Sequence, residues 1–289
     1  MRDEAGYREI IQGALHPTLE GLGGIPPKLM EAMLYSLTAG GKRLRPVLLL
    51  ASCEMAGGSI EKAIPYACAL EMIHTYSLIH DDLPGMDNDD LRRGKPTNHK
   101  VFGEGMAILA GDGLLNSALE IALKTAVESG DFGGVRAAEI LARHAGVSGM
   151  IGGQSVDILM EGSKPTEETV AYIHAHKTAD LIQAPMEMGL TLAGCKPEIV
   201  SAGACYGYHL GMAFQIVDDL LDALGDPEIL GKNVGMDKDK MTWVALKGIS
   251  GARTDAEEHT RRAVEKLDNL PWETGFFRKI ALDNLMRNH

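Results

Sequence analysis

The chain has few aromatic residues and few cysteines, and these scarcities limit the classes of protein to which it can belong. Of its 289 residues, 5% are aromatic and 4 are cysteines. The cysteines form no C-x-x-C pair and have no zinc-type spacing, so we expect reduced thiols and a cytoplasmic location. The N-terminus lacks an apolar signal core, and no uninterrupted apolar run approaches the roughly 20 residues of a membrane helix. We therefore expect no membrane insertion.

Positive charge is also scarce. The chain has 28 lysines and arginines against 40 aspartates and glutamates, which gives a net charge of -12. A nucleic-acid partner requires a basic footprint, so this balance argues against nucleic acid and against an anionic membrane surface. An anionic substrate would require basic residues and metal ions concentrated at one place.

Strand-like alternation is scarce as well, and apolar residues mostly recur at helical spacing. The helical segments are residues 28–38, 43–57, 61–82, 104–128, 134–146, 167–193 and 198–224. Thr166 and Thr254 have the surroundings of helix N-termini. The linkers are short and rich in Gly and Pro, with no low-complexity segment or internal repeat. We predict an all-α fold, with residues 1–289 forming one domain, a helical bundle around a central cavity.

Two acidic clusters stand at the ends of apolar helical segments. They are Asp81, Asp82 and Asp87 in the first, and Asp218, Asp219 and Asp222 in the second. A helix C-terminus already carries about half a negative charge, so carboxylates gathered there need cations. Hard ions such as Mg2+ take oxygen ligands and usually keep positions open for substrate phosphates. The pattern predicts a magnesium cage for a diphosphate, with two helices as opposite walls; the simpler alternative is two exposed acidic helix ends.

Basic residues flank both clusters. They are Lys42, Arg43 and Arg45 in one segment, Arg92 and Arg93 after the first cluster, Lys177 before Thr178, and Lys232 after the second cluster. Arginine forks suit phosphate oxygens, and lysine acts as a mobile point charge. Each one alone could be an ordinary surface charge, but their position beside the clusters favours diphosphate binding. His74 lies two helical turns before Asp81 and could face the same cavity, whereas His80 is read as a packing residue.

Several motifs together resemble one family. The run from His74 to Thr97, HTYSLIHDDLPGMDNDDLRRGKPT, resembles the first aspartate-rich motif of the trans-polyprenyl diphosphate synthases, and FQIVDDLLD at Phe214–Asp222 resembles the second. Segments 40–46, 110–112, 149–154 and 177–178 also match, in the family's order. The resemblance covers nearly the whole chain and is greatest to bacterial farnesyl diphosphate synthases.

This resemblance implies a magnesium-dependent homodimer that condenses isopentenyl diphosphate with dimethylallyl or geranyl diphosphate. It implies metal binding, with three ions per site, by Asp81, Asp82, Asp87, Asp218 and Asp222. It implies isopentenyl diphosphate binding by Lys42, Arg45, His74 and Arg93. It implies allylic diphosphate binding by Arg92, Lys177, Thr178, Gln215 and Lys232. Asp219 and Lys177 join the metal-binding aspartates as catalytic candidates.

Two segments depart from the family pattern. The loop 231–242 is shorter before Lys240 than in many relatives, which leaves open whether Lys238 or Lys240 approaches the pyrophosphate. Gly85 stands where relatives often have a larger residue.

Product length is expected to depend on Tyr76 and Ser77. Tyr76 lies five residues before Asp81, about 7.5 Å along a helix that rises ~1.5 Å per residue. A bulky residue here resembles the stop that favours farnesyl diphosphate, made through geranyl diphosphate, although an ordinary core tyrosine is the simpler alternative. The neighbouring motif also resembles geranylgeranyl diphosphate synthases, so that product stays open.

Two other functions also stay open. A class I terpene cyclase would share the helices and the metals but would not need a second diphosphate site. A non-catalytic regulatory subunit of a prenyl synthase would be expected to lose one of the two carboxylate clusters.

Overall fold

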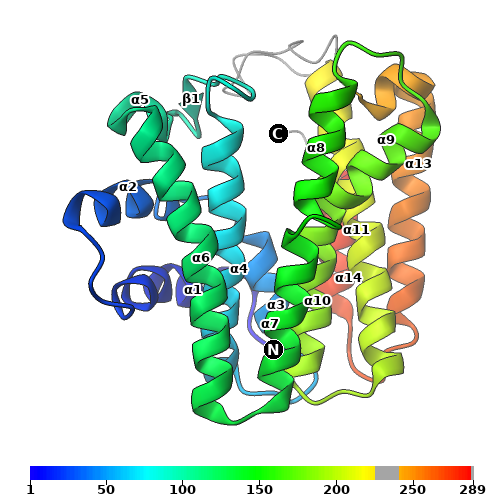
Figure 1. Cartoon of the computed structure of the whole chain (residues 1–289). Coiled ribbons are helices and arrows are strands. Elements are labelled where there is room, and N and C mark those ends of the chain that lie inside the picture. The colour runs from blue at the N-terminus through cyan, green and yellow to red at the C-terminus, as the bar shows by residue number, and fades with distance from the viewer. Residues whose placement is uncertain (225–240, 288–289) are drawn as a thin grey trace. The chain divides into compact units, whose positions relative to one another are not determined.

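The structure, a computed structural model, describes residues 1–224 and 241–287, and within them helices dominate (Figure 1). The helices are α1 (Glu4–Glu20), α2 (Pro27–Leu37), α3 (Leu44–Met55), α4 (Ile60–Asp81), α5 (Asn98–Phe102), α6 (Glu104–Ser129), α7 (Phe132–Ala145), α8 (Met150–Met160), α9 (Glu167–Ile173), the π-helix η1 (His174–Ala179), α10 (Asp180–Leu192), α11 (Pro197–Leu224), α13 (Trp243–Leu267) and α14 (Gly275–Leu285). Strands β1 (Leu91–Arg92) and β2 (Lys95–Pro96) form one short antiparallel pair. The predicted all-α class is confirmed.

The described residues form two compact units. The first contains Met1–Leu141 and Met188–Gly194, and the second contains the described residues of 142–187 and 195–289. The division falls inside α7 and α10. That the whole chain is one domain around a central cavity stays a prediction.

Helix α4 is the central element of the first unit, where it packs against α6, α3, α1 and α2. Its residues from Tyr66 to Ile73 are all buried, so neighbours surround this part of the helix on every side. The helix ends at Asp81, and Pro84 follows closely, since proline cannot continue a helical hydrogen-bond ladder. The first acidic cluster therefore begins where a buried helix reaches the surface.

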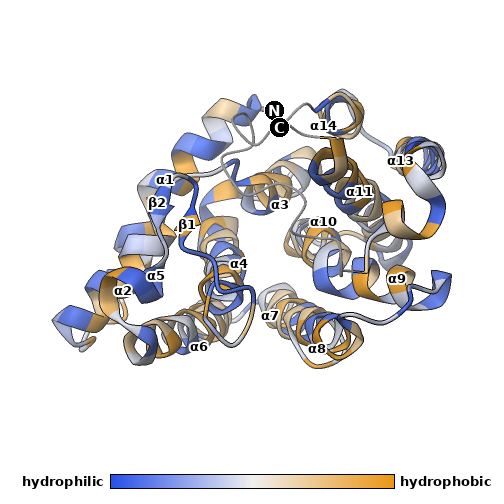
Figure 2. Ribbon diagram, turned by 90° about the horizontal axis from the view of Figure 1, so that it is seen from above, coloured by the Kyte–Doolittle hydropathy of each residue, from blue (hydrophilic) through white to orange (hydrophobic). Residues whose placement is uncertain are grey.

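Helix α11 has the same place in the second unit, where it packs against α13, η1 and α14. Hydrophobic residues run along much of α11, whereas α13 carries long hydrophilic stretches (Figure 2). The core of this unit includes Ile216, Val217 and Leu220. The second acidic cluster therefore lies in a helical stretch whose apolar residues are buried. The carboxylates of this second cluster lie in the last two turns of α11, whereas in the first cluster only Asp81 lies within its helix.

The two predicted helix starts have different outcomes. Thr166 caps α9, because its side chain accepts a hydrogen bond from the Thr169 backbone N–H at 3.2 Å. Thr254 lies inside α13, and its hydroxyl donates to the Ser250 carbonyl at 3.1 Å, so the second predicted start is wrong. The chain breaks earlier, at Gly248, whose φ of 69° is favourable for glycine.

Helix α6 is long and apolar enough, by composition alone, to cross a membrane. Within its most apolar stretch 44% of the residues are buried in the protein, and the helix packs against α4, α2 and α5. A core helix has the same length and hydropathy, so this helix alone does not indicate a membrane span.

Candidate functional site

A loop and a β-turn place the basic residues of the first unit together. Arg93 Nη1 donates a hydrogen bond to the Gly40 carbonyl. A Cβ atom on Gly41, whose φ is 119°, would lie 2.6 Å from the Arg93 Cζ. Only glycine therefore lets the Arg93 guanidinium lie on the loop. The structure thus brings Arg93 to the segment that carries Lys42 and Arg45, and their binding of isopentenyl diphosphate stays a prediction.

Arg45 and His74 form a second contact in this group. Arg45 Nη1 lies 3.4 Å from His74 Nε2. Burial holds the pKa of His74 well below its usual value, and the positive charges of Arg45 and Arg93 lower this pKa further. His74 is therefore neutral at physiological pH and can accept a hydrogen bond from Arg45, so it orients this arginine without adding charge.

The residues of the first acidic cluster have different surroundings. The Asp87 backbone N–H donates to the Asp81 carbonyl at 2.8 Å, so the loop folds back onto the end of α4. Asp82 is buried and pairs with Arg92 at 2.6 Å. Burial raises the pKa of Asp82, and the Arg92 hydrogen bond and charge oppose that rise. Asp82 therefore orients Arg92, and its role as a magnesium ligand stays a prediction.

A pocket in the second unit gathers several predicted residues. Its empty volume is about 450 Å³, part of which is open to solvent, and its lining includes Lys177, Thr178, Gln215 and Asp219. The Thr178 hydroxyl donates to Gln215 Oε1 at 2.7 Å, and Lys177 Nζ lies 2.5 Å from Asp157 Oδ2. Asp157 was not predicted from the sequence, because a single aspartate on an apolar helix has no distinguishing pattern.

Asp219 holds this pocket together. Its Oδ2 accepts a hydrogen bond from the Trp243 backbone N–H at 2.7 Å, and its Oδ1 accepts a hydrogen bond from Gln215 Nε2 at 3.1 Å. His174 Nε2 lies 3.3 Å from the same carboxylate and was also missed from the sequence. Asp219 is 6% exposed, so its carboxylate connects α11, η1 and the start of α13 within the protein.

Asp218, the neighbour of Asp219, has a different partner. Arg287 Nη2 lies 2.5 Å from Asp218 Oδ1, and the guanidinium lies 4.2 Å from the Phe214 ring. Arg287 was not predicted, because it is 69 residues away in sequence. Asp222 follows one turn later on α11. The predicted Lys232, with Lys238 and Lys240, lies outside the described residues.

The carboxylates fit a hard divalent ion that binds together with a phosphate group. Within residues 1–224 and 241–287, no three His, Cys, Asp or Glu side chains are grouped closely enough to hold a metal ion by themselves. Magnesium is usually bound through one or two carboxylates plus substrate phosphates. Asp81 with Asp87, and Asp218 with Asp222, have the donor chemistry for this kind of binding.

The two residues predicted to control product length lie on α4. Tyr76 is 5% exposed, and its ring meets the His80 ring edge-on with centroids 5.7 Å apart. Its hydroxyl is buried and has no hydrogen-bond partner among the described residues. The Ser77 hydroxyl donates to the His74 carbonyl at 3.0 Å, within the helix. His80 itself approaches the Ile108 carbonyl at 3.1 Å, as a packing residue would.

Comparisons with known proteins agree on one family. Residues 26–270 match the polyprenyl synthetase family model. The chain is 47% identical over 265 residues to a farnesyl diphosphate synthase of Geobacillus stearothermophilus, covering 91% of this chain and 89% of the relative. It is 46% identical over 264 residues to a geranylgeranyl diphosphate synthase of Cyanophora paradoxa, covering 90% and 87%.

Solved structures of similar proteins agree with this result. The geranyltransferase from Helicobacter pylori, complexed with magnesium and isoprenyl diphosphate, has a TM-score of 0.81 and 31% identity, with 99% of this chain and 97% of that chain covered. A geranylgeranyl pyrophosphate synthase has a TM-score of 0.90 and 28% identity, with both chains fully covered (100%).

Proposed function

Because the chain belongs to the polyprenyl synthetase family, we propose that it is a short-chain trans-prenyltransferase that joins isopentenyl diphosphate to an allylic diphosphate. The observation that supports the proposal is the presence of two separate groups of residues with the basic and hydroxyl donors that phosphate binding requires. One is the arginine group around His74 in the first unit, and the other is the pocket with Lys177 and Thr178 in the second. A reaction between two diphosphates needs both.

The charged residues account for the chemistry. Arg45 and Arg93, with neutral His74, bind isopentenyl diphosphate, while Lys177 and Thr178 bind the allylic diphosphate. Asp81 with Asp87, and Asp218 with Asp222, would hold magnesium ions, which when bound stabilise the leaving pyrophosphate.

The bond changes follow from this binding. The allylic C–O bond breaks, and the double bond of isopentenyl diphosphate attacks the resulting cation to form a C–C bond. The released pyrophosphate accepts the proton whose loss restores an alkene. Apolar side chains around the prenyl chain exclude water, which would otherwise capture the cation.

Product chromatography tests the proposal. The protein is incubated with magnesium, isopentenyl diphosphate and either dimethylallyl or geranyl diphosphate. Asp81→Ala and Asp218→Ala should each lose most turnover, while Asp268→Asn, a change at an exposed aspartate paired with Arg278, should retain it. Cyclic hydrocarbons formed without isopentenyl diphosphate would indicate a terpene cyclase. The complete absence of prenyl products would favour a non-catalytic subunit.

We propose farnesyl diphosphate as the main product, with geranylgeranyl diphosphate as the alternative. The bulk of Tyr76 on α4, just before the acidic cluster, supports a limit on chain length. The relatives are divided between the two products, so similarity alone does not choose. Tyr76→Ala should lengthen the product, whereas an unchanged distribution would assign Tyr76 to the core only.

We also propose that the enzyme is a homodimer. Exposed apolar side chains on α6 support this: Ile108, Leu109, Leu123 and Val127 are between 44% and 78% exposed. An α-helix turns about 100° per residue, so these four side chains lie within an arc of roughly 100° around the helix axis. They therefore form one apolar face, which is suited to contact with a second copy of the chain. Light scattering after gel filtration measures the mass, and Leu109→Glu should reduce it to that of a monomer if this face forms the contact.

A further inference from the structure

A partly buried network of charged residues lies next to η1 and is separate from every motif named above. We infer that Asp180, which is hydrogen-bonded to His144, is a positioning residue that fixes the π-helical turn. By fixing this turn it orients Lys177 and Thr178 towards the allylic diphosphate. This inference rests on the proposed function. All of the residues concerned belong to the second unit.

The first observation is the unusual backbone of η1. Residues 174–179 form a π-helix between α9 and α10. Wide turns of this kind are rare and frequently occur at functional sites. A Cβ atom on Gly153 of α8 would lie 2.2 Å from the Lys177 backbone N, and one on Gly211 of α11 would lie 2.5 Å from the Ala179 Cα. The backbones of α8 and α11 therefore lie directly against the wide turn of η1.

The second observation is that η1 is held by side chains from three elements. Asp157 of α8 forms an ion pair with Lys177, and Gln215 of α11 accepts a hydrogen bond from the Thr178 hydroxyl. Asp180, the first residue of α10, accepts a hydrogen bond from His176 Nδ1 at 2.8 Å. His176 directly precedes Lys177, so Asp180 is the contact that fixes the backbone just before the two ligand-binding residues.

The third observation is that Asp180 is itself held in place. Its other oxygen lies 2.8 Å from Nδ1 of His144, a side chain at the end of α7 that is 3% exposed. His144 Nε2 lies 2.9 Å from Glu187 Oε2, and Arg143 Nη2 lies 2.9 Å from Glu187 Oε1. An imidazole placed between two carboxylates donates from both nitrogens and carries a positive charge.

The network thus pairs two positive groups with two negative ones. Burial alone would lower the pKa of His144, but the hydrogen bonds and charges of Asp180 and Glu187 raise it above its usual value. The positive charge near the C-terminus of α7 also suits the dipole of that helix. Asp180 is therefore a fixed anchor between α7 and η1.

Loss of the Asp180 carboxylate should release His176 and allow η1 to relax towards α-helical geometry. One residue corresponds to about 100° of rotation in an α-helix, so the side chains that follow His176 would turn away from the pocket. Binding of the allylic diphosphate should weaken, because Lys177 and Thr178 bind it from this turn. Binding of isopentenyl diphosphate should not change, because its predicted ligands belong to the first unit.

Steady-state kinetics of the full-length enzyme test the inference. Asp180→Asn keeps the size of the side chain but leaves only one acceptor for two histidines, and Asp180→Ala removes both. Each should raise KM for geranyl diphosphate roughly tenfold, the effect expected when a supporting hydrogen bond is lost, with KM for isopentenyl diphosphate unchanged. His144→Gln should act in the same direction with a smaller change, since Asp180 keeps His176.

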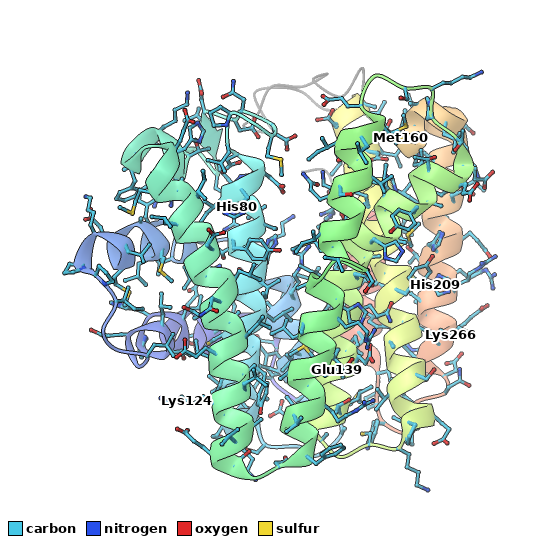
Figure 3. The ribbon with its side chains drawn as sticks, in the orientation of Figure 1. His80, Lys124, Glu139, Met160, His209 and Lys266 are labelled. Atoms are coloured by element: carbon cyan, nitrogen blue, oxygen red, sulfur yellow. The ribbon has the colours of Figure 1, made fainter. Side chains whose placement is uncertain are left out.

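His209→Gln is the matched control. His209, labelled in Figure 3, is a partly buried histidine of the same unit, and its Nδ1 lies 3.1 Å from Nδ1 of His259, which is not part of η1. It should leave both KM values unchanged. The inference is overturned if the Asp180 variants behave like this control, or if they raise both KM values equally while circular dichroism shows a folded protein.

A direct binding measurement keeps the two proposals distinguishable. Calorimetric titration with inorganic pyrophosphate and magnesium needs no turnover, and both Asp180 variants should bind roughly tenfold more weakly than the wild type. If the wild type makes no prenyl product, the proposed function fails, and this titration alone decides the role of Asp180. If Asp180→Ala does not fold, the same measurements on Asp180→Asn decide the role of Asp180.

Discussion

Replacing Glu71 with glutamine should destabilise the first unit strongly, because it leaves a buried arginine without its counter-charge. The Arg43 and Glu71 side chains are 1% and 2% exposed and form an ion pair. Arg43 keeps one other bond, from Nη2 to the Leu37 carbonyl at 2.7 Å. Glu71 also offsets positive charge at Arg93, so its loss affects the whole basic group.

The magnitude follows from the burial of the pair. Removing one partner of a buried ion pair destabilises a protein by about 3–5 kcal/mol. Glutamine still offers an oxygen acceptor, so we expect Glu71→Gln to fall near the lower end, about 3 kcal/mol. At ~2–4 °C per kcal/mol, this corresponds to a fall in Tm of about 6–12 °C.

A double-mutant cycle provides the decisive assay. Arg43→Met with Glu71→Leu removes both charges and keeps apolar volume, so it should be close to the wild type or more stable. Urea unfolding followed by circular dichroism measures the free energy of unfolding of the wild type, the single variants and the double variant. The reasoning is refuted if Glu71→Gln costs less than about 1 kcal/mol, or if the double variant loses the sum of the single losses.

Three further predictions concern a depressed histidine pKa, a raised one and a buried hydroxyl. Burial is the main cause that lowers the pKa of His209 from 6.5 to about 4, and the charge of His259 is the second. The contribution of His209 to stability is therefore complete above pH 6.5 and is lost as the pH falls towards 4. His209→Gln should flatten the fall in Tm over that range, and an unaltered pH profile would contradict this. The pKa of His144 is instead raised above 6.5, so its contribution is complete below pH 6.5 and is lost as the pH rises through its pKa in the folded protein. His144→Gln should therefore lower Tm more at about pH 6 than at about pH 9, and an equal loss at both would argue against the charged form. Tyr76→Phe removes a buried hydroxyl that has no partner among the described residues, so it should leave stability unchanged or raise it by about 1 kcal/mol. A loss of more than about 1 kcal/mol in urea unfolding would show that this hydroxyl is bonded.

Features that depend on a local pattern of residues could be predicted without the structure. Apolar spacing predicted the helices that became α4 and α11, and the proline after Asp82 marked the end of α4. The predicted helix over 167–193 became α9, η1 and α10, because apolar spacing does not distinguish a π-turn from an α-turn. The family was recognisable for the same reason, since its motifs are continuous runs of residues.

The different roles of two adjacent aspartates became visible only in the folded protein. Asp218 and Asp219 are neighbours in one motif, yet one pairs with Arg287 and the other anchors Trp243. The same is true of the buried partner of Arg43, 28 residues away, which no local pattern indicates. The physical reason is that a charged side chain acquires its role from the groups that share its burial, and distant segments of the chain supply those groups only when it folds.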